Sequence, residues 1–233
     1  MLIKLKKRIL KSKKLLRNKV SRAYKGLMLP KDPKIFCIGL NKTGTTSLKT
    51  EFIRQGFLVG DQRAAERLAK NYRKGDFESI IKYCKSARVF QDVPFSWPET
   101  YKHLDKAFPD AKFILSVRDS PEQWFNSRVK FDKKRYGGKL PSVDDVKNNN
   151  YVYPGWSYEN LQFFRNGDIK KRYDKDLRIA EYNKYNAEVK TYFADRKDKL
   201  LVINVGKSEA YHEFCSFMGL SPIGDSFPWK NKS

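Results

Sequence analysis

Residues 41–47 bring together groups that suit a bound anion. The segment has the sequence Asn-Lys-Thr-Gly-Thr-Thr-Ser. Its side chains that could contact an anion are those of Lys42, Thr43, Thr45, Thr46 and Ser47. Gly44 lets the backbone approach a ligand closely. The first N–H groups of a helix lack internal partners and carry partial positive charge. If a helix begins here, these groups converge on a phosphate or a sulfate.

A buried strand before this segment and a helix after it would position these groups. Residues 34–40 form a short apolar run rich in β-branched and aromatic side chains, which is typical of a buried strand. Leu48, Phe52 and Ile53 recur at helical spacing, which predicts a helix over 45–55. The sequence therefore predicts a strand, a polar loop and a helix N-terminus in that order.

The loop differs from the P-loop of nucleoside triphosphatases. Gly39 and Gly44 have the G-x-x-x-x-G spacing, but Thr45 and Thr46 follow where Lys and Ser or Thr are expected. The lysine lies inside the loop, at position 42. A nucleotide kinase needs that lysine on the phosphates and a hydroxyl on magnesium. The loop therefore suits a phosphate or sulfate without a metal better, and a phosphoryl-transfer enzyme on a P-loop-like fold is the alternative.

A second strand-to-helix junction supplies an arginine and a serine. The predicted strand 112–117 ends at Arg118. Ser-Pro at 120–121 is typical of a helix start, which places Ser127 on the following helix. Because ligands bind at the carboxyl ends of parallel strands, Arg118 should share a sheet edge with the first loop. Its guanidinium can hold phosphate through two hydrogen bonds, whereas a salt bridge with a nearby acid, such as Asp119, is the alternative role.

Together these junctions resemble those of the sulfotransferases that use 3′-phosphoadenosine 5′-phosphosulfate (PAPS), in particular the bacterial type. The resemblance spans roughly residues 34–230. It implies that the loop, through Thr45, Thr46 and the backbone of 43–47, holds the 5′-phosphate of PAPS. It also implies that Arg118 and Ser127 hold the 3′-phosphate, although their spacing is one residue wider than the commonest family pattern. The implied co-substrate is PAPS, and no metal is required.

The resemblance further implies how sulfuryl transfer would be catalysed. Lys42 would stabilise the leaving oxygen. Many family members use a histidine or a glutamate near the end of the central strand as general base, and this chain has no histidine there. Asp92 ends the predicted strand 88–92, and we expect it to take the proton of the acceptor hydroxyl. The alternative is that Asp92 caps the turn at Pro94.

The order of predicted elements favours an α/β fold. Strands are predicted over 34–40, 57–60, 88–92, 112–117 and 199–205, with helices between them. This order predicts a three-layer αβα domain with a mostly parallel sheet of four to five strands, similar to the P-loop NTPases. The length of 233 residues suits one such domain. Residues 132–170 contain Gly, Pro, Asn and aromatic side chains, and predict a long loop region that acts as a lid or a substrate loop.

Positive charge is concentrated at the N-terminus. The formal net charge is +23, and residues 1–25 contain eleven Lys and Arg and no acid. The pattern predicts a basic amphipathic helix over 1–29, followed by the catalytic domain over 30–233. Such a helix could lie on an anionic membrane surface, so a non-enzymatic membrane-surface protein is the second alternative. Since no recognised nucleic-acid-binding module accompanies the helix, nucleic acid is not an expected partner.

The remaining composition bears on the cellular location of the protein, on disulfides and on metal sites. No apolar run has the length of a signal-peptide core or a membrane span, which predicts a cytoplasmic protein that could also lie peripherally on a membrane. Cys37, Cys84 and Cys215 have no paired spacing, which predicts buried, reduced thiols. His103 and His212 are too far apart in sequence to suggest a metal site. The expected partner is an acceptor with a hydroxyl group, on a glycan, a lipid-linked alcohol or a small alcohol or phenol.

Overall fold

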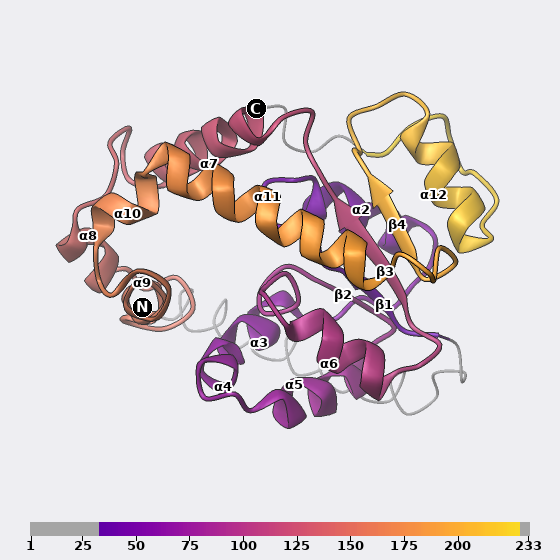
Figure 1. Cartoon of the computed structure of the whole chain (residues 1–233), viewed down its shortest axis with the longest axis horizontal. Helices are drawn as coiled ribbons and strands as arrows, with labels where there is room; N and C mark the ends of the chain where they lie inside the picture. Colours follow the sequence, from indigo (N-terminus) through magenta and orange to yellow (C-terminus); the bar gives the residue numbers. More distant parts are fainter. Residues whose placement is uncertain (1–32, 229–233) are drawn as a thin grey trace, which may run out of the picture.

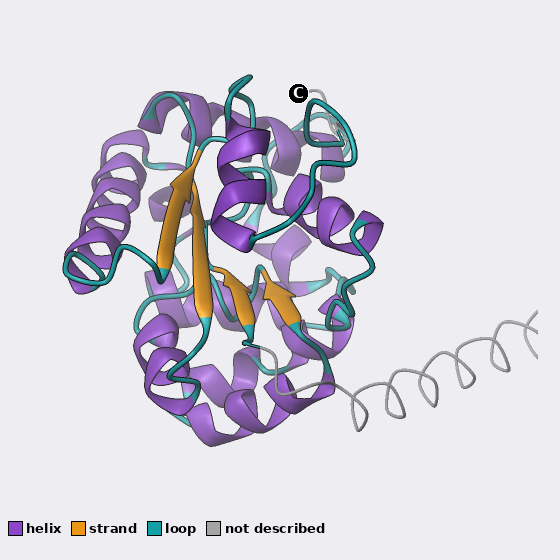
Figure 2. Cartoon of the chain, turned by 90° about the vertical axis from the view of Figure 1, so that its right-hand side faces the viewer, coloured by secondary structure: helices purple, strands orange, loops and turns teal. Residues whose placement is uncertain are grey.

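The computed structural model describes residues 33–228, so the predicted basic helix over 1–29 lies outside the described residues. At its centre is a four-stranded sheet whose strands are all parallel (Figure 2). The strands lie side by side in the order β2 (Val89–Gln91), β1 (Ile35–Cys37), β3 (Lys112–Ser116) and β4 (Leu200–Ile203). The predicted α/β class and the parallel sheet are confirmed.

Alternate side chains of the strands face two separate cores. Phe36 and Phe113 point into one core, and Ile35 and Ile114 point into the other, as expected from the two-residue repeat of a strand. The first core lies under α5 (Phe77–Tyr83), α6 (Thr100–Ala107) and α11 (Lys175–Tyr192). The second lies under α2 (Thr45–Arg54) and α12 (Ala210–Met218) (Figure 1). Helices therefore cover both faces of the sheet, which confirms the three-layer αβα arrangement.

One predicted strand is shorter in the structure. The strand expected over 57–60 is reduced to a single bridge between Val59 and Val89. The charged stretch 62–87 that follows is divided into α3 (Gln62–Arg67), α4 (Ala69–Arg73), α5 and a 3-10 turn (Cys84–Ser86). Gly75, with φ +72°, separates α4 from α5. No helix within 33–228 has the length and apolar character needed to cross a membrane.

Residues 132–170 are mostly helical, so the prediction of a long loop region was wrong. α7 (Pro121–Arg135) runs into this region, and α8 (Val143–Lys147), α9 (Trp156–Arg165) and the start of α10 (Ile169–Tyr173) follow. Ser142 forms a capping box with Asp145 at the start of α8. The glycines and prolines that predicted a loop therefore separate short helices. α8, α9 and α10 gather at the end of the molecule away from β4 (Figure 1).

The three cysteines within the described chain are buried and unpaired, as predicted. Burial raises the pKa of the Cys37 and Cys84 thiols well above their usual range. Because the thiolate is the reactive form, these two side chains serve packing rather than chemistry.

Candidate active site

Close backbone packing fixes the loop between β1 and α2. A Cβ at Gly39 would lie 2.1 Å from the Oγ of Ser116, and a Cβ at Gly44 would lie 2.2 Å from a methyl group of Val205. Gly44 also has φ +107°, so only glycine fits there without strain. α2 begins at Thr45, and no side chain caps its first turn. The N–H of Ser47 donates to the carbonyl of Gly44 at 2.9 Å, whereas the N–H groups of Thr45 and Thr46 donate no hydrogen bond within 33–228 and can bind an anion.

The hydroxyls of the loop have different surroundings. Thr43 is buried, donates to the carbonyl of Leu40 at 2.5 Å and lies 2.7 Å from the Oγ of Ser116. Thr45 and Thr46 line a large cavity, whereas Ser47 is not part of its described lining. The N–H of Thr43 also donates to the carbonyl of Leu40, at 3.2 Å, and Thr43 does not line the cavity, so this residue holds the shape of the loop.

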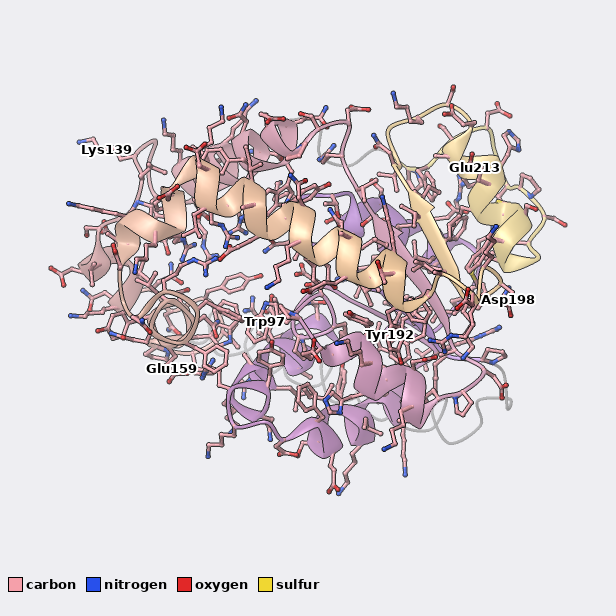
Figure 3. The ribbon with its side chains drawn as sticks, viewed as in Figure 1. Trp97, Lys139, Glu159, Tyr192, Asp198 and Glu213 are labelled. Carbon is pink, nitrogen blue, oxygen red and sulfur yellow. The ribbon has the colours of Figure 1, made fainter. Side chains whose placement is uncertain are left out.

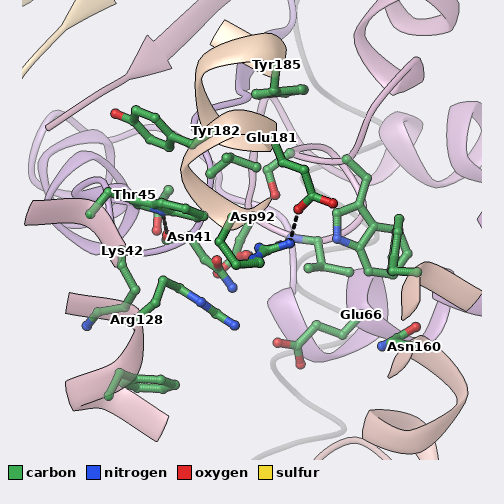
Figure 4. Close-up of a pocket in the computed structure, with 18 of the residues that line it drawn as sticks. Asn41, Lys42, Thr45, Glu66, Asp92, Arg128, Asn160, Glu181, Tyr182 and Tyr185 are labelled. Carbon is green, nitrogen blue, oxygen red and sulfur yellow. Dashed lines mark hydrogen bonds and ion pairs between the residues drawn. The ribbon is translucent and has the colours of Figure 1, made fainter. Parts of the chain in front are cut away.

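Lys42 reaches into the same cavity beside Arg128 (Figure 4). Its Nζ lies 4.6 Å from the centroid of the Phe131 ring. Burial and the positive charges of Arg118 and Arg128 lower the pKa of the Lys42 ammonium. A bound anion would relieve both effects because it supplies the missing negative charge.

Arg118 is joined to the loop rather than to an acid. Its Nε donates to the backbone carbonyl of Lys42 at 2.7 Å, and its backbone N–H donates to the hydroxyl of Tyr182 at 3.0 Å. Asp119 pairs with Lys207 at 3.1 Å, and within 33–228 Arg118 forms no salt bridge. Burial lowers the pKa of Arg118. Its side chain lines a separate hollow of about 290 Å³ beside α11.

Ser127 lies near the middle of α7. Its Oγ is buried and has no hydrogen-bond partner in the described part of the chain. A buried hydroxyl without a partner costs roughly 1–3 kcal/mol, so an oxygen-rich ligand at this position would be favoured. Ser127 lines neither of the two hollows. The structure thus places Arg118 and Ser127 on consecutive elements but outside the large cavity.

Asp92 follows β2 and lines the large cavity (Figure 4). Its Oδ1 accepts a hydrogen bond of 2.9 Å from the N–H of Val93, so it also supports the turn as the alternative interpretation expected. Its Oδ2 accepts no hydrogen bond from residues 33–228. Burial raises the pKa of the carboxyl, and the charges of Arg128 and Lys49 offset part of that effect. A carboxylate with a raised pKa and a free oxygen is a competent general base.

Glu66 and Tyr151 are two further acid–base groups of the cavity that the sequence analysis missed. Glu66 accepts a hydrogen bond of 2.9 Å from the Tyr151 hydroxyl and pairs with Arg63 at 2.9 Å. Burial raises the pKa of Glu66, and burial also raises the pKa of Tyr151 to about 12. Glu66 and Ala65 are the buried residues of α3, and the sequence of this short charged helix carries no signal that would single out Glu66.

The large cavity encloses about 790 Å³ between the strand ends and α7, α9 and α11. Aromatic side chains in its walls include those of Trp97, Trp124, Phe131, Trp156 and Phe164. Trp97 lies near the centre of the molecule, whereas Glu159 lies on α9 at the far end (Figure 3). A space of this size holds a drug-sized ligand. A ligand bound at the strand edge and a second ligand bound against α9 can therefore meet inside it.

A comparison with family models gives one match. A model described as a sulfotransferase domain matches residues 34–233. The match begins at β1 and includes the loop before α2, Asp92, Arg118 and Ser127. A search among curated proteins returned no match.

Proposed function

The chain belongs to the sulfotransferase domain family, and we propose that it transfers a sulfuryl group from PAPS to a hydroxyl group of an acceptor. One observation carries the proposal. The uncapped start of α2, the ammonium of Lys42 and the carboxylate of Asp92 meet at the carboxyl edge of a parallel sheet. An anion site with a general base opposite it is the arrangement that in-line group transfer requires.

Donor binding would use both strand-to-helix junctions. The backbone of 43–47, with the hydroxyls of Thr45, Thr46 and Ser47, would hold the 5′-phosphate. Arg118 and Ser127 would hold the 3′-phosphate. Two features of residues 33–228 support this fit: the buried Oγ of Ser127 lacks a partner among them, and Arg118 uses its Nε on the loop while its two Nη groups donate no hydrogen bond to these residues.

The side chains would divide the chemical work. PAPS, when bound, supplies the activated sulfuryl group. Asp92 would take the proton of the acceptor hydroxyl as its oxygen bonds to sulfur. Lys42 would stabilise the negative charge that develops on the phosphate oxygen as the bond from sulfur to that oxygen breaks. Trp156 and its neighbours on α9 would cover the acceptor and exclude water.

Thermal unfolding tests the donor site directly. The ligand is 3′-phosphoadenosine 5′-phosphate (PAP), the product of the donor, added in EDTA. A ligand that binds only the folded state stabilises it by about 2.7 kcal/mol at a hundredfold excess over its dissociation constant. We expect a clear rise in melting temperature with PAP that is lost in Arg118→Ala.

Two controls separate this proposal from its alternatives. A rise with ATP and magnesium but not with PAP would indicate a phosphoryl-transfer enzyme instead. No rise with either nucleotide would contradict a donor site and favour a binding protein that acts through residues 1–29. Formation of a sulfated product from radiolabelled PAPS would then show the reaction itself.

A further inference from the structure

Four arginines in the wall of the large cavity share two carboxylates. We call Arg128, Arg165, Arg172 and Arg178 the arginine cluster; they come from α7, α9, α10 and α11. Asp132 is paired with Arg172 at 2.9 Å and lies 3.9 Å from Arg128. Glu181 is paired with Arg165 at 2.5 Å and also with Arg178. The cluster therefore holds two more positive charges than negative ones.

Each carboxylate contacts the cluster through a single oxygen, Oδ2 of Asp132 and Oε2 of Glu181. Asp132 is 2% exposed and also accepts a hydrogen bond of 2.9 Å from the Tyr173 hydroxyl. Although burial raises its pKa, the charges of Arg128 and Arg172 outweigh burial and lower it, so Asp132 stays ionised. Arg172 makes the short contact with this oxygen, and Arg128 is left with the contact of 3.9 Å.

Arg128 is the member left without a hydrogen bond. Its side chain is 20% exposed, and its only ion pair in the described chain is the 3.9 Å contact with Asp132. It donates no hydrogen bond to any residue of 33–228, although a guanidinium has five N–H groups. Burial of an unsatisfied charge is costly. Figure 4 shows Arg128 beside Lys42 at the side of the cavity.

Most of the cluster lies away from the proposed donor site, whereas Arg128 borders it, next to Ser127 on α7 and beside Lys42. The groups assigned to the donor phosphates lie at the start of α2 and at the junction of β3 and α7. Arg165 and Arg172 belong to α9 and α10, at the end of the molecule away from β4 (Figure 1). The charge of Arg128 acts on Asp92, the proposed base, and on Lys42. An anion held by the cluster would therefore place its own molecule next to the base.

We propose that the arginine cluster binds an anionic group of the acceptor, which makes the acceptor a molecule that already carries a carboxylate, phosphate or sulfate ester near the hydroxyl to be sulfated. This inference rests on the proposed function, because it assigns the acceptor side of the same cavity. Arginine suits the role because its planar fork binds all three groups through paired hydrogen bonds.

Inorganic phosphate serves as a probe that needs no knowledge of the acceptor skeleton. The full chain is saturated with PAP, and phosphate binding is then measured by calorimetry. We expect saturable binding that weakens roughly tenfold or more in Arg128→Gln and in Arg172→Gln, since each loses a charge-assisted contact. The dissociation constant of PAP should stay within about twofold in Arg172→Gln.

A matched control and a conservative variant complete the design. Lys171→Gln makes the same charge change on the same short helix, but this side chain is exposed and does not line the cavity. Arg172→Lys keeps the pair with Asp132 if Arg172→Gln fails to fold. Arg128→Gln breaks no hydrogen bond within the described residues and should fold. Lys42→Ala distinguishes the cluster from the sulfuryl position, because phosphate held at the sulfuryl position would be weakened by Lys42→Ala and left unchanged by Arg172→Gln.

Acceptor pairs with one skeleton test the consequence for transfer. Glucose is compared with glucose 6-phosphate, and tyrosol with 4-hydroxyphenylacetate, using radiolabelled PAPS. Faster sulfation of the anionic members, lost in Arg172→Gln, supports the proposal. Equal rates for charged and neutral members would overturn it, as would phosphate binding that Arg128→Gln and Arg172→Gln leave unchanged. If none of these acceptors is sulfated, the phosphate binding measured by calorimetry decides whether the proposal stands.

The two proposals fail in different ways. If PAP does not bind, the proposed sulfotransfer fails, but phosphate binding to the free protein still reports on the cluster. If PAP binds and phosphate does not, the donor site stands and only the anionic acceptor is rejected.

Discussion

The Nε of Arg118 donates a hydrogen bond of 2.7 Å to the backbone carbonyl of Lys42. This bond joins the end of β3 to the loop before α2, at a residue whose backbone has φ +74°. A non-glycine residue in that region needs support from its surroundings. The residue proposed for the 3′-phosphate therefore also sets the shape of the loop proposed for the 5′-phosphate.

Substitution of Arg118 should affect both halves of the donor site. Arg118→Ala removes a charge-assisted hydrogen bond worth about 1.5–3 kcal/mol, so we expect PAP to bind roughly ten- to a hundredfold more weakly. Arg118→Lys keeps the charge but loses the fork, and should recover only part of the affinity. Calorimetric titration with PAP measures both. Equal affinity in Arg118→Ala and the wild type would remove Arg118 from the site.

Gly44→Ala should unfold the loop or the protein. The Cβ would meet Val205 at 2.2 Å, and φ is +107°. Strain of this kind costs roughly 1–3 kcal/mol, and the steric overlap adds roughly as much again. Gly75→Ala is the matched control, because Gly75 has φ +72° but nothing within 4 Å of its Cβ. Chemical denaturation should show a larger loss of unfolding free energy for Gly44→Ala than for Gly75→Ala. Adding Val205→Ala to Gly44→Ala should recover the part of that loss that comes from the steric overlap.

Asp92→Asn should lower turnover more than Glu66→Gln. Asp92 has one oxygen free for the acceptor, whereas Glu66 is held by Tyr151 and Arg63. Loss of a general base typically costs about 10²–10⁴-fold, and we expect less than about tenfold for Glu66→Gln, which keeps the shape of the side chain. Turnover of radiolabelled PAPS measures both variants. The reverse ranking would make Glu66 the base.

Asp92→Asn should also stabilise the fold at neutral pH. The pKa of Asp92 is raised in the folded protein by burial, so the folded state binds this proton more tightly than the unfolded state. The contribution of Asp92 to stability is therefore most favourable below the ordinary pKa of an aspartate, about 3.9, and falls as the pH rises through the raised value. Asp92→Asn does not show this decrease in stability, because an amide does not ionise. Its melting temperature should exceed that of the wild type at neutral pH, and the two should converge in acid.

The sequence was informative where one local rule determines the structure. Gly44, the apolar run before it and the Ser-Pro at 120–121 each obey a local rule, and α2 and α7 begin where these rules place them. The parallel sheet then brought Asp92 and Arg118 to the edge that carries Lys42.

Residues whose role depends on tertiary contacts could not be found in this way. Glu66 and Tyr151 are 85 positions apart in the chain and meet because Tyr151 and α9 pack against α3 and α4. The residues of the arginine cluster lie on four helices. The sequence of each helix gives no sign that the other three lie close to it. Residues 132–170 have the composition of a loop region, because their short helices are bounded by the same glycines and prolines that favour turns. The composition therefore predicted a loop where short helices form.

Tyr182 lines both the large cavity and the smaller hollow beside α11. Under the proposed function, the 5′-phosphate would lie in the large cavity with the acceptor, and Arg118 would hold the 3′-phosphate at the smaller hollow. The nucleotide would therefore extend past Tyr182 from one hollow into the other, and this side chain would contact the molecule that connects them.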